Sequence, residues 1–262
     1  METEQRTALE ALGIAVAARE PVLLWGGPGT GKSSAVRDLA AAVDWPCEVV
    51  IASIREPSDF AGLPVVADGG VRFAPPRWAQ RLAKAGRGVL FLDEISTAPP
   101  AVQAALLRVV LERVVGDLEL PQEVAVVAAA NPPEQAADGW DLSAPLANRF
   151  CHLDWSSDAS TFAEGLTAGW PQAPIPHLPG DWRTRQSSAR GLVAAFVGVR
   201  PNLVLDMPKE AGAAGQAWPS PRTWDMAARL WTACDQCGAS DAARRALVTG
   251  AVGTGAGIEF VT

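Results

Sequence analysis

A glycine-rich octapeptide near the N-terminus carries the clearest chemical signal in the sequence. It reads Gly26-Gly27-Pro28-Gly29-Thr30-Gly31-Lys32-Ser33 and fits the pattern G-x-x-x-x-G-K-[ST]. Glycines let backbone N–H groups turn inward around a phosphate, and a helix that begins at the end of the loop adds its positive dipole. We expect Lys32 to reach the β- and γ-phosphates of a nucleotide and the Ser33 hydroxyl to ligate Mg²⁺. The expected nucleotide contacts in this loop are Gly27, Pro28, Gly29, Thr30, Gly31, Lys32 and Ser33.

Two adjacent carboxylates follow an apolar run sixty residues after Ser33. The run Val89-Leu90-Phe91-Leu92 is typical of a buried strand, and Asp93 and Glu94 come directly after it. On its own such a pair is more often a solvated helix cap, whereas behind a phosphate-binding loop it suits catalysis. We expect Asp93 to bind the nucleotide-associated Mg²⁺ together with Ser33. Glu94 is expected to polarise the water that attacks the γ-phosphate.

The elements that must position these residues alternate between helices and strands. Apolar residues at helical spacing predict a helix over 3–19, which Pro21 ends. Beyond it we expect strands at 22–25, 48–52, 89–92, 124–129 and 150–153, and helices at 33–43, 76–85 and 99–110. Continuous apolar strands between helices indicate an α/β fold whose parallel sheet is covered on both faces.

Two insertions interrupt this alternation. An Asp-Gly-Gly turn at 68–70 between apolar runs predicts a β-hairpin over 65–73, and residues 114–120 predict a second hairpin. After Trp155 the pattern changes to a proline-rich stretch and candidate helices, so we place a domain boundary at about residue 155. The candidate helices lie near 158–168, 187–199, 222–236 and 239–250. Trp224 and Trp231 fall on one face of the third of them, which favours core packing.

The composition argues against nucleic-acid and membrane partners. The 262 residues include 22 basic and 29 acidic side chains, for a net charge of −7, and no Lys/Arg run is present. A nucleic-acid-binding surface needs a large positive excess. The longest apolar runs reach only seven or eight residues, whereas a membrane-spanning helix needs about 20. The acidic N-terminus also differs from a secretory signal.

The four cysteines are too few for a disulfide-built scaffold of this size, which leads us to expect a reduced cytoplasm. Cys234 and Cys237 form a lone C-x-x-C motif, for which a structural role is commoner than metal binding or redox chemistry. His152 and His177 are isolated in the sequence, and nothing arranges them for catalysis.

With these motifs the sequence resembles the AAA+ ATPases and, within them, the MoxR-like group. The resemblance rests on the glycine-rich loop, on Asp93-Glu94, on Asn131 after an apolar strand, and on Leu146–Phe150 and Ser220–Thr223. It implies an AAA+ core with a five-stranded parallel sheet over 1–155 and a small helical lid over 156–262. Residues from about 55 to 77 look like the group's insert in its second helix. The resemblance also implies a homo-oligomeric ring, usually a hexamer, with ATP and Mg²⁺ bound between subunits.

Three further residues take roles from this resemblance. Asn131 looks like sensor 1, which orients the attacking water, and this interpretation is favoured over a turn residue before Pro132-Pro133. Arg149 looks like the arginine finger, and Arg222 like sensor 2. Taken alone, each arginine would more often be a surface salt-bridge partner. The arginines at 108 and 113 are alternative contacts to a neighbouring subunit.

The function expected from the resemblance is ATP hydrolysis that remodels or activates a protein partner, typically one with a von Willebrand factor A domain. One alternative is a nucleotide-gated scaffold without significant turnover, against which the presence of Glu94, Asn131 and Arg149 argues. Another is a DNA-acting motor, against which the net acidity argues. The Pro/Trp-rich linker at 170–182 fits no family pattern, and the arginines at 183, 185 and 190 after it form a solvated face or a partner contact.

Overall fold

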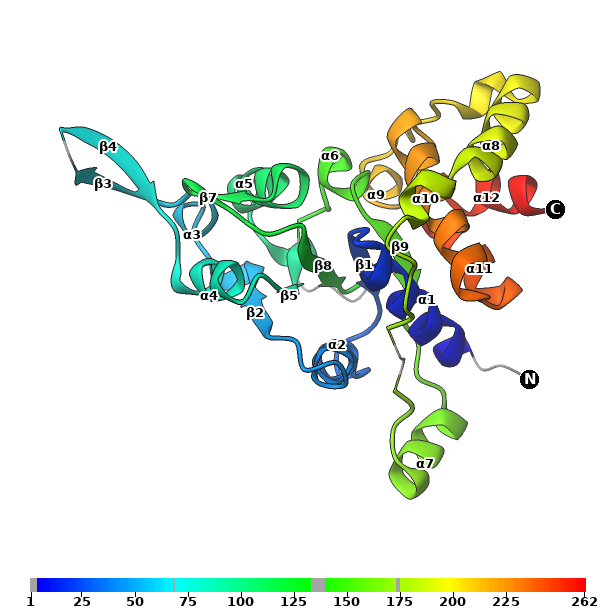
Figure 1. Cartoon of the computed structure of the whole chain (residues 1–262), viewed down its shortest axis with the longest axis horizontal. Helices are drawn as coiled ribbons and strands as arrows, with labels where there is room; N and C mark the ends of the chain where they lie inside the picture. Colours follow the sequence, from blue (N-terminus) through cyan, green and yellow to red (C-terminus); the bar gives the residue numbers. More distant parts are fainter. Residues whose placement is uncertain (1–3, 68, 133–139, 173–174) are drawn as a thin grey trace.

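A five-stranded parallel sheet forms the centre of the molecule (Figure 1). The computed structural model describes residues 4–67, 69–132, 140–172 and 175–262. The strand order is β2-β5-β8-β1-β9, and every neighbouring pair is parallel. The strands are β1 (Val22–Trp25), β2 (Cys47–Ile51), β5 (Arg87–Asp93), β8 (Glu123–Ala130) and β9 (Cys151–Asp154). The predicted α/β fold with a five-stranded parallel sheet is confirmed.

Both faces of the sheet are buried, as the continuous apolar strands require. In β1 the side chains of Val22 and Leu24 enter one hydrophobic cluster, and those of Leu23 and Trp25 enter a second cluster on the opposite face. Four helices flank the sheet: α1 (Glu4–Ala18), α2 (Lys32–Ala41), α4 (Arg77–Ala85) and α5 (Pro100–Glu112). Two shorter helices, α3 (Ser58–Ala61) and α6 (Ala144–Ala147), also belong to this part of the chain.

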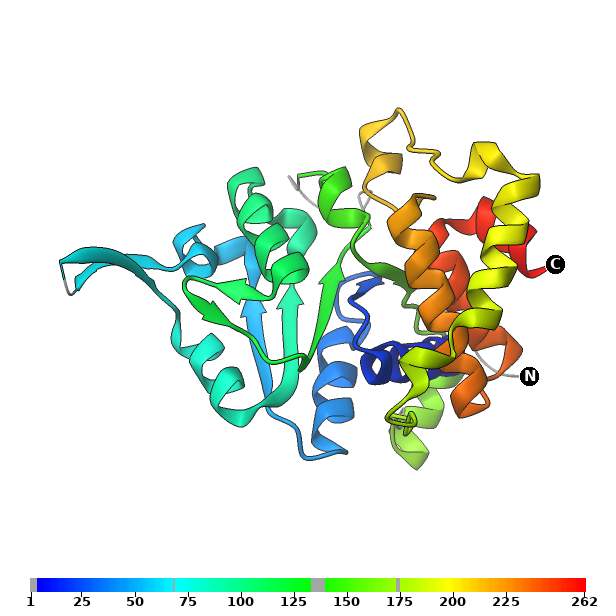
Figure 2. The same cartoon turned by 45° about the horizontal axis from the view of Figure 1, so that its top comes forward.

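Both predicted hairpins are present. The first pairs β3 (Leu63–Ala67) with β4 (Gly70–Ala74), and it projects from the body on the side away from the C-terminus (Figures 1 and 2). Its side chains are largely solvent-exposed, with Val66 at 87%. Asp68 of the predicted turn lies outside the described residues. The second hairpin pairs β6 (Val114–Val115) with β7 (Leu118–Glu119).

The region after β9 is helical, as expected. Its helices are α7 (Ala159–Ala168), α8 (Ser187–Val199), α9 (Ala211–Ala214), α10 (Pro221–Cys237), α11 (Asp241–Val252) and α12 (Thr254–Val261). Helix α10 begins with a capping box, in which Ser220 and Thr223 exchange side-chain and backbone hydrogen bonds. Helix α12 was not predicted from the sequence; its Phe260 ring packs 5.4 Å from the rings of both Trp224 and Trp231.

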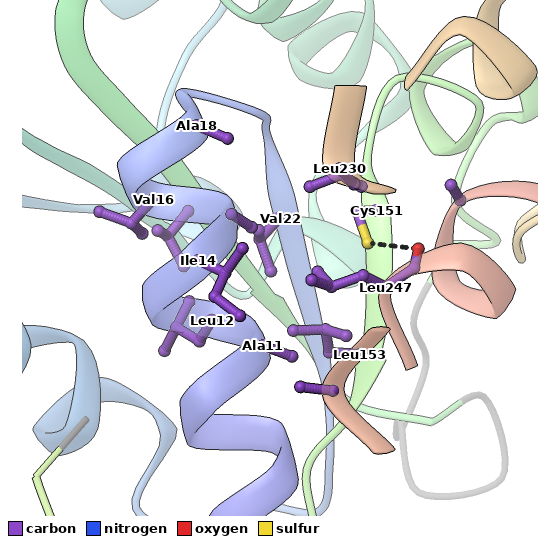
Figure 3. Close-up of a cluster of buried hydrophobic side chains, with 14 of the residues drawn as sticks. Ala11, Leu12, Ile14, Val16, Ala18, Val22, Cys151, Leu153, Leu230 and Leu247 are labelled. Atoms are coloured by element: carbon purple, nitrogen blue, oxygen red, sulfur yellow. Dashed lines mark hydrogen bonds between the residues drawn. The ribbon is translucent and has the colours of Figure 1, made fainter. Parts of the chain in front are cut away.

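Helices α10 and α11 pack directly against the sheet layer. Leu230 and Leu247 belong to the same buried cluster as α1 and β9 (Figure 3). Gly250 of α11 lies so close to β9 that an added Cβ would stand 2.1 Å from the His152 carbonyl oxygen. The C-terminal helices therefore share one continuous core with one face of the sheet, while the division at residue 155 stays a prediction.

No helix within the part of the chain that the structure describes combines the length and the apolar character needed to cross a membrane.

Candidate active site

The glycine-rich loop lies between the end of β1 and the start of α2. Gly29 and Gly31 adopt φ angles of 77° and 87°, in the left-handed region that favours glycine. The Thr30 hydroxyl donates to the Gly27 carbonyl oxygen at 2.8 Å. The Trp155 indole N–H donates to the Thr30 carbonyl oxygen at 3.0 Å, so the residue directly after β9 holds the loop backbone in place. This strand–loop–helix arrangement is the context expected of a phosphate-binding loop.

Lys32 is buried, and its ammonium group points back into the loop. Nζ donates to the carbonyl oxygens of Gly26 at 2.5 Å and Gly27 at 2.9 Å, and to Asn131 Oδ1 at 3.2 Å. Burial lowers the pKa of Lys32, an effect that the negative charge of Asp93 opposes. The three ammonium donors are thus satisfied by loop and strand-end oxygens, which a phosphate oxygen can replace.

Asp93 and Ser33 stand next to each other, as the predicted metal site requires. Ser33 Oγ donates to Asp93 Oδ2 at 2.8 Å, and the other carboxylate oxygen accepts from the Glu94 backbone N–H at 3.0 Å. A hydroxyl and a carboxylate are hard oxygen ligands, and Mg²⁺ is usually bound by one or two such groups plus substrate phosphates. The two side chains therefore fit the metal predicted at this position.

Glu94 has an unusual backbone and a partner that the sequence analysis did not foresee. Its φ and ψ are 56° and 41°, in the left-handed region, which is uncommon for a residue with a side chain. Its carboxylate accepts a hydrogen bond of 2.5 Å from Ser53 Oγ, two residues beyond β2. The register that pairs Ile51 with Asp93 brings Ser53 to this point. Because that register joins β2 to β5, the sequence alone could not reveal the contact.

Asn131 lies at the end of β8, beside the loop. Its Oδ1 accepts from Lys32, and its carbonyl oxygen is 3.5 Å from Ser96 Oγ. Strands β1 and β8 are adjacent and parallel, so the ends of both strands reach the same edge of the sheet. The structure therefore brings Asn131 together with Lys32; Pro133 of the turn considered above lies outside the described residues.

A cavity of ≈ 460 Å³ adjoins the loop. Gly29, Thr30 and Gly31 form one wall, and aromatic side chains form another. These are Trp155, Phe162 and Trp170, of which the last two are in ring contact at 5.7 Å. A cavity of this size with flat apolar walls beside a phosphate-binding loop suits the base and sugar of a nucleotide. The part of the linker near Trp170, which the sequence left without a role, thus contributes to the cavity.

Arg149 and Arg222 lie near each other, joined through Asn148. Asn148 is buried; its Oδ1 accepts from Ser220 Oγ at 2.8 Å and from Arg222 Nη1 at 3.4 Å, and its Nδ2 donates to the Trp218 carbonyl oxygen at 3.2 Å. Burial and the charge of Arg222 lower the pKa of Arg149. Within the described residues, Nε of Arg149 is buried without a hydrogen-bond partner, and neither arginine bonds to the loop.

The remaining candidate residues have structural surroundings. Arg113 donates through both Nη atoms to the Val124 carbonyl oxygen at the start of β8, away from the loop of its own chain, and its contact to a neighbouring subunit stays a prediction. His152 accepts from the Trp25 indole at 2.8 Å, and burial lowers its pKa to about 4.

All four cysteines are free. In the described ranges no group of three or more His, Cys, Asp or Glu side chains could hold a metal ion.

Comparisons with known proteins show which sequences and folds this chain resembles. Residues 21–150 match the family described as "AAA domain (dynein-related subfamily)". The chain is 37% identical over 120 residues to the Psp operon transcriptional activator of Escherichia coli (strain K12), a match covering 43% of this chain. It is 33% identical over 138 residues, or 48% of this chain, to the Nif-specific regulatory protein of Sinorhizobium fredii. These matches span 37% and 23% of the two relatives.

Among solved structures, the fold is similar to that of a candidate ATPase from Cytophaga hutchinsonii, with a TM-score of 0.57 and 18% identity. That similarity covers 89% of this chain and 76% of the other, so it extends beyond the sheet into the helical region. At this identity it speaks for the fold alone. The sheet, the phosphate-binding loop and the family match over residues 21–150 therefore agree on the fold of an AAA domain.

Proposed function

We propose that this protein is a Mg²⁺-dependent ATPase of the MoxR-like group that remodels or activates a protein partner. The observation that carries the proposal is the convergence of five residues at one edge of the sheet. Lys32 bonds to Asn131, Ser33 bonds to Asp93, and Glu94 follows Asp93 directly. A protein that only bound phosphate would need the lysine, but it would have no use for a carboxylate placed to activate water.

Each residue has a distinct task in the proposed reaction. Ser33 and Asp93 would hold Mg²⁺, which when bound neutralises charge on the phosphate oxygens. Lys32 exchanges its carbonyl partners for phosphate oxygens. Glu94, once released from Ser53, accepts a hydrogen bond from the attacking water and orients it toward the γ-phosphate, with Asn131 holding that water from the other side. The cavity beside the loop receives the base.

We further propose that hydrolysis requires a homo-oligomeric ring, most simply a hexamer, in which Arg149 reaches a neighbour's γ-phosphate. Two observations support this assignment. Arg149 has no bond to the loop of its own chain within the described residues, and its buried Nε lacks an acceptor there. Arg222, by contrast, lies in the first turn of α10 and donates to Asn148, which suits a residue that acts on its own subunit's nucleotide.

The partner proposed is a protein with a von Willebrand factor A domain, and the surface proposed to engage it is the hairpin β3–β4. This hairpin stands away from the body and exposes Leu63, Val66 and Val71 to solvent (Figure 2). Exposed apolar side chains on an extension of this kind mark interaction sites. The free cysteines are compatible with the reduced cytoplasm in which we place the protein.

The experiment that tests the proposal is a nucleotide-trap capture. Glu94→Gln should bind ATP with nearly unchanged affinity and hydrolyse it about 10²–10⁴-fold more slowly, since the general base is lost. The tagged variant with ATP should then retain its protein partner in a cell extract. Glu119→Gln, an exposed carboxylate on β7, is the matched control and should hydrolyse ATP at the wild-type rate. Wild-type turnover in Glu94→Gln would overturn the catalytic assignment, and absent turnover in the unmodified protein with any partner would favour a scaffold.

A second candidate function follows from the relatives' names. Both curated relatives described above are named as transcriptional or regulatory proteins, and their identity to this chain lies at 33–37%. The chain would then serve as the ATPase unit of a transcription regulator. The same capture distinguishes the two: a component of the transcription apparatus among the retained proteins favours this candidate, and a von Willebrand factor A domain protein favours the first.

A further inference from the structure

A second cavity, of ≈ 420 Å³, lies at the opposite edge of the sheet from the glycine-rich loop. Three parts of the chain form it: the end of α1, the segment after α2, and the linker after α7, with Glu123 at the start of β8. Among the residues that line it are Arg19, Trp45, Glu123, His177, Trp182 and Arg183. None of them lines the cavity beside the loop. The proline-rich linker that matched no family pattern therefore builds much of this site.

The charges around the cavity are unbalanced. Arg19 donates to Glu123 Oε2 through Nε at 3.2 Å and through Nη2 at 2.6 Å. Two more guanidinium groups, those of Arg113 and Arg183, act on the same carboxylate, and together the three arginines hold the pKa of Glu123 below its ordinary value. The neighbouring Glu20 is neutralised by a bidentate pair with Arg229. Of the charged side chains that line the cavity, Arg19 and Arg183 lie around the single carboxylate of Glu123, which leaves a local excess of positive charge in a chain whose net charge is −7.

Two of these guanidinium groups are held in place by indole rings. Arg19 lies over the ring of Trp45 at 4.7 Å, and Arg183 lies over the ring of Trp182 at 4.9 Å. Arg19 is fully engaged, because its third nitrogen donates to the Val16 carbonyl oxygen. Arg183 is different: only its Nη2 is used, toward the Ala18 carbonyl oxygen at 2.9 Å, and within the described residues Nη1 and Nε have no partner. A positioned guanidinium with spare donors is a ready partner for an anion.

Apart from the imidazole of His177, the rest of the lining is nonpolar. Val43, Ile175 and Leu178 contribute aliphatic side chains, and the prolines at 176 and 179 add rigid ones. An occupant therefore needs an anionic group for Arg183 and a compact apolar part for these walls. A phosphate monoester carries close to two negative charges at neutral pH, and its oxygens match the planar fork of a guanidinium group. We propose that this cavity is a second ligand site, for a small organic phosphate monoester that binds Arg183 through its phosphate.

Two helices connect this site with the glycine-rich loop. Helix α1 lines the loop cavity with Gln5 and Leu9 and ends beside the second cavity at Arg19. Helix α2 begins at Lys32, and the chain reaches the second cavity at Val43 directly after it. A ligand that fixes the ends of both helices therefore changes nucleotide affinity at their other ends, and nucleotide reciprocally changes the affinity for the phosphate monoester. This coupling rests on the proposed nucleotide function, whereas the ligand site itself does not.

The test uses phenyl phosphate as the probe and calorimetry as the readout. The full-length Lys32→Ala protein is titrated, so that the glycine-rich loop does not compete for phosphate. Phenyl phosphate should bind, and phenol, which lacks the charge, should bind at least about tenfold more weakly. Inorganic phosphate, which lacks the ring, should also bind more weakly. Adding Arg183→Gln should weaken phenyl phosphate about tenfold, and Arg183→Lys should have a smaller effect because charge is kept and the planar fork is lost.

Arg185→Gln is the matched control. Arg185 is an exposed arginine two residues away, pairs with Asp181 and Gln236, and does not line the cavity. Its replacement should change phenyl phosphate affinity less than twofold. Equal losses in Arg183→Gln and Arg185→Gln, or equal binding of phenol and phenyl phosphate, would overturn the site. A circular dichroism spectrum like that of the parent protein, together with a single cooperative thermal transition above the titration temperature, establishes that Arg183→Gln is folded.

The coupling has its own measurement. ADP affinity of the chain with Lys32 intact is measured with and without saturating phenyl phosphate, and a change of threefold or more is expected in wild type but not in Arg183→Gln. An unchanged ADP affinity would overturn the coupling and leave the ligand site standing. Failure of ADP to bind at all would refute the proposed nucleotide function, while the titrations of the Lys32→Ala protein would still decide the second site.

Discussion

Two polar clusters lie at the two edges of the central sheet that are formed by the carboxyl ends and the amino ends of its strands. The two clusters differ in charge. At the carboxyl ends of the strands, Lys32, Ser33, Asp93 and Asn131 bond to one another and to the loop, and the cluster has both signs of charge. At the amino ends, the arginines at 19, 113 and 183 gather around Glu123, and the cluster is cationic. The first cluster is a set of mutually positioned groups that phosphate and Mg²⁺ can enter. The second has spare cationic donors beside apolar walls.

The difference indicates that the carboxyl edge of the sheet serves catalysis, whereas the amino edge serves packing and anion binding. Carboxyl-end side chains follow their strands directly, so a change there alters chemistry while the sheet remains intact. Amino-end side chains hold α1, α10 and the linker against the sheet, as the Glu20–Arg229 pair and the Arg183–Ala18 bond do. We therefore expect substitutions at the first edge to alter turnover and those at the second to alter stability or anion affinity.

The largest effect should come from Arg149, which tests whether the carboxyl-edge cluster is complete in one chain. No arginine bonds to Lys32, Ser33, Asp93 or Asn131 within the described ranges. If a neighbour supplies it, Arg149→Ala should lower ATPase activity roughly 10³-fold or more, the size of arginine-finger effects. Steady-state phosphate release, measured over a range of protein concentrations, checks this.

Mixing provides the control for action between subunits. Rings that contain Arg149→Ala and Glu94→Gln subunits hold some interfaces in which an intact Glu94 faces an intact Arg149. Activity should reappear on mixing, although each variant is inactive alone. A rate per subunit that is the same at all concentrations, from a species that sedimentation shows to be monomeric, would contradict action in trans.

The second-largest effect should appear at the amino edge, in stability. Arg229→Met leaves the buried Glu20 without its bidentate partner, and loss of one member of a buried pair costs about 3 kcal/mol. Arg190→Met is the control, since Arg190 forms an exposed pair with Asp225 and should cost less than about 1 kcal/mol. Urea unfolding measures both. If Lys32→Ala, at the carboxyl edge, lost a similar unfolding free energy, the two edges would not differ in their contribution to stability.

How far the sequence could predict the two edges follows from how each is built. The carboxyl edge was predictable because its residues stand directly after strands or within one contiguous motif, so Asp93 and Asn131 could be assigned before the strand order was known. The strands themselves were found within one or two residues, since the buried segments are continuous apolar runs.

The amino edge was not predictable, because its partners are far apart in the chain. Arg19 and Glu123 are 104 residues apart, and the sequence offered no reason to pair them. The same limit hid Ser53 as the partner of Glu94, since it depends on which strands are neighbours. Helix α12 was missed for another reason: Gly255 and Gly257 lower its helix propensity, and the packing of Phe260 on two tryptophans compensates.

A third prediction concerns His152, a buried residue of strand β9. Its protonation should affect stability and leave catalysis unchanged. Its pKa in the folded protein is about 4, against about 6.5 in the unfolded chain, so the unfolded state binds more protons in that interval. Stability should therefore be full above pH 6.5 and fall as the pH is lowered, by about 2 kcal/mol at pH 5. Unfolding free energies of wild type and His152→Gln, compared from pH 7.5 to 5, test this. The decline should be smaller in the variant, and an equal decline in both proteins would assign it to other groups.

The smallest effect we predict concerns Ser53. It tests whether the Glu94 carboxylate is positioned for catalysis while it is bonded to Ser53. The 2.5 Å bond from Ser53 Oγ occupies the carboxylate that should activate water. Hydrogen bonds to charged groups contribute roughly 1.5–3 kcal/mol, and because Glu94 is exposed we expect about 1 kcal/mol here. Ser53→Ala should therefore raise basal ATPase about fivefold with no change in ATP affinity, because the carboxylate is free for a larger fraction of the time. Ser53→Thr keeps the hydroxyl and should retain the wild-type rate. An unchanged or lower rate in Ser53→Ala would mean that the bond positions Glu94 for the reaction instead of withholding it, and the carboxyl edge would then be as fully prearranged as its other hydrogen bonds suggest.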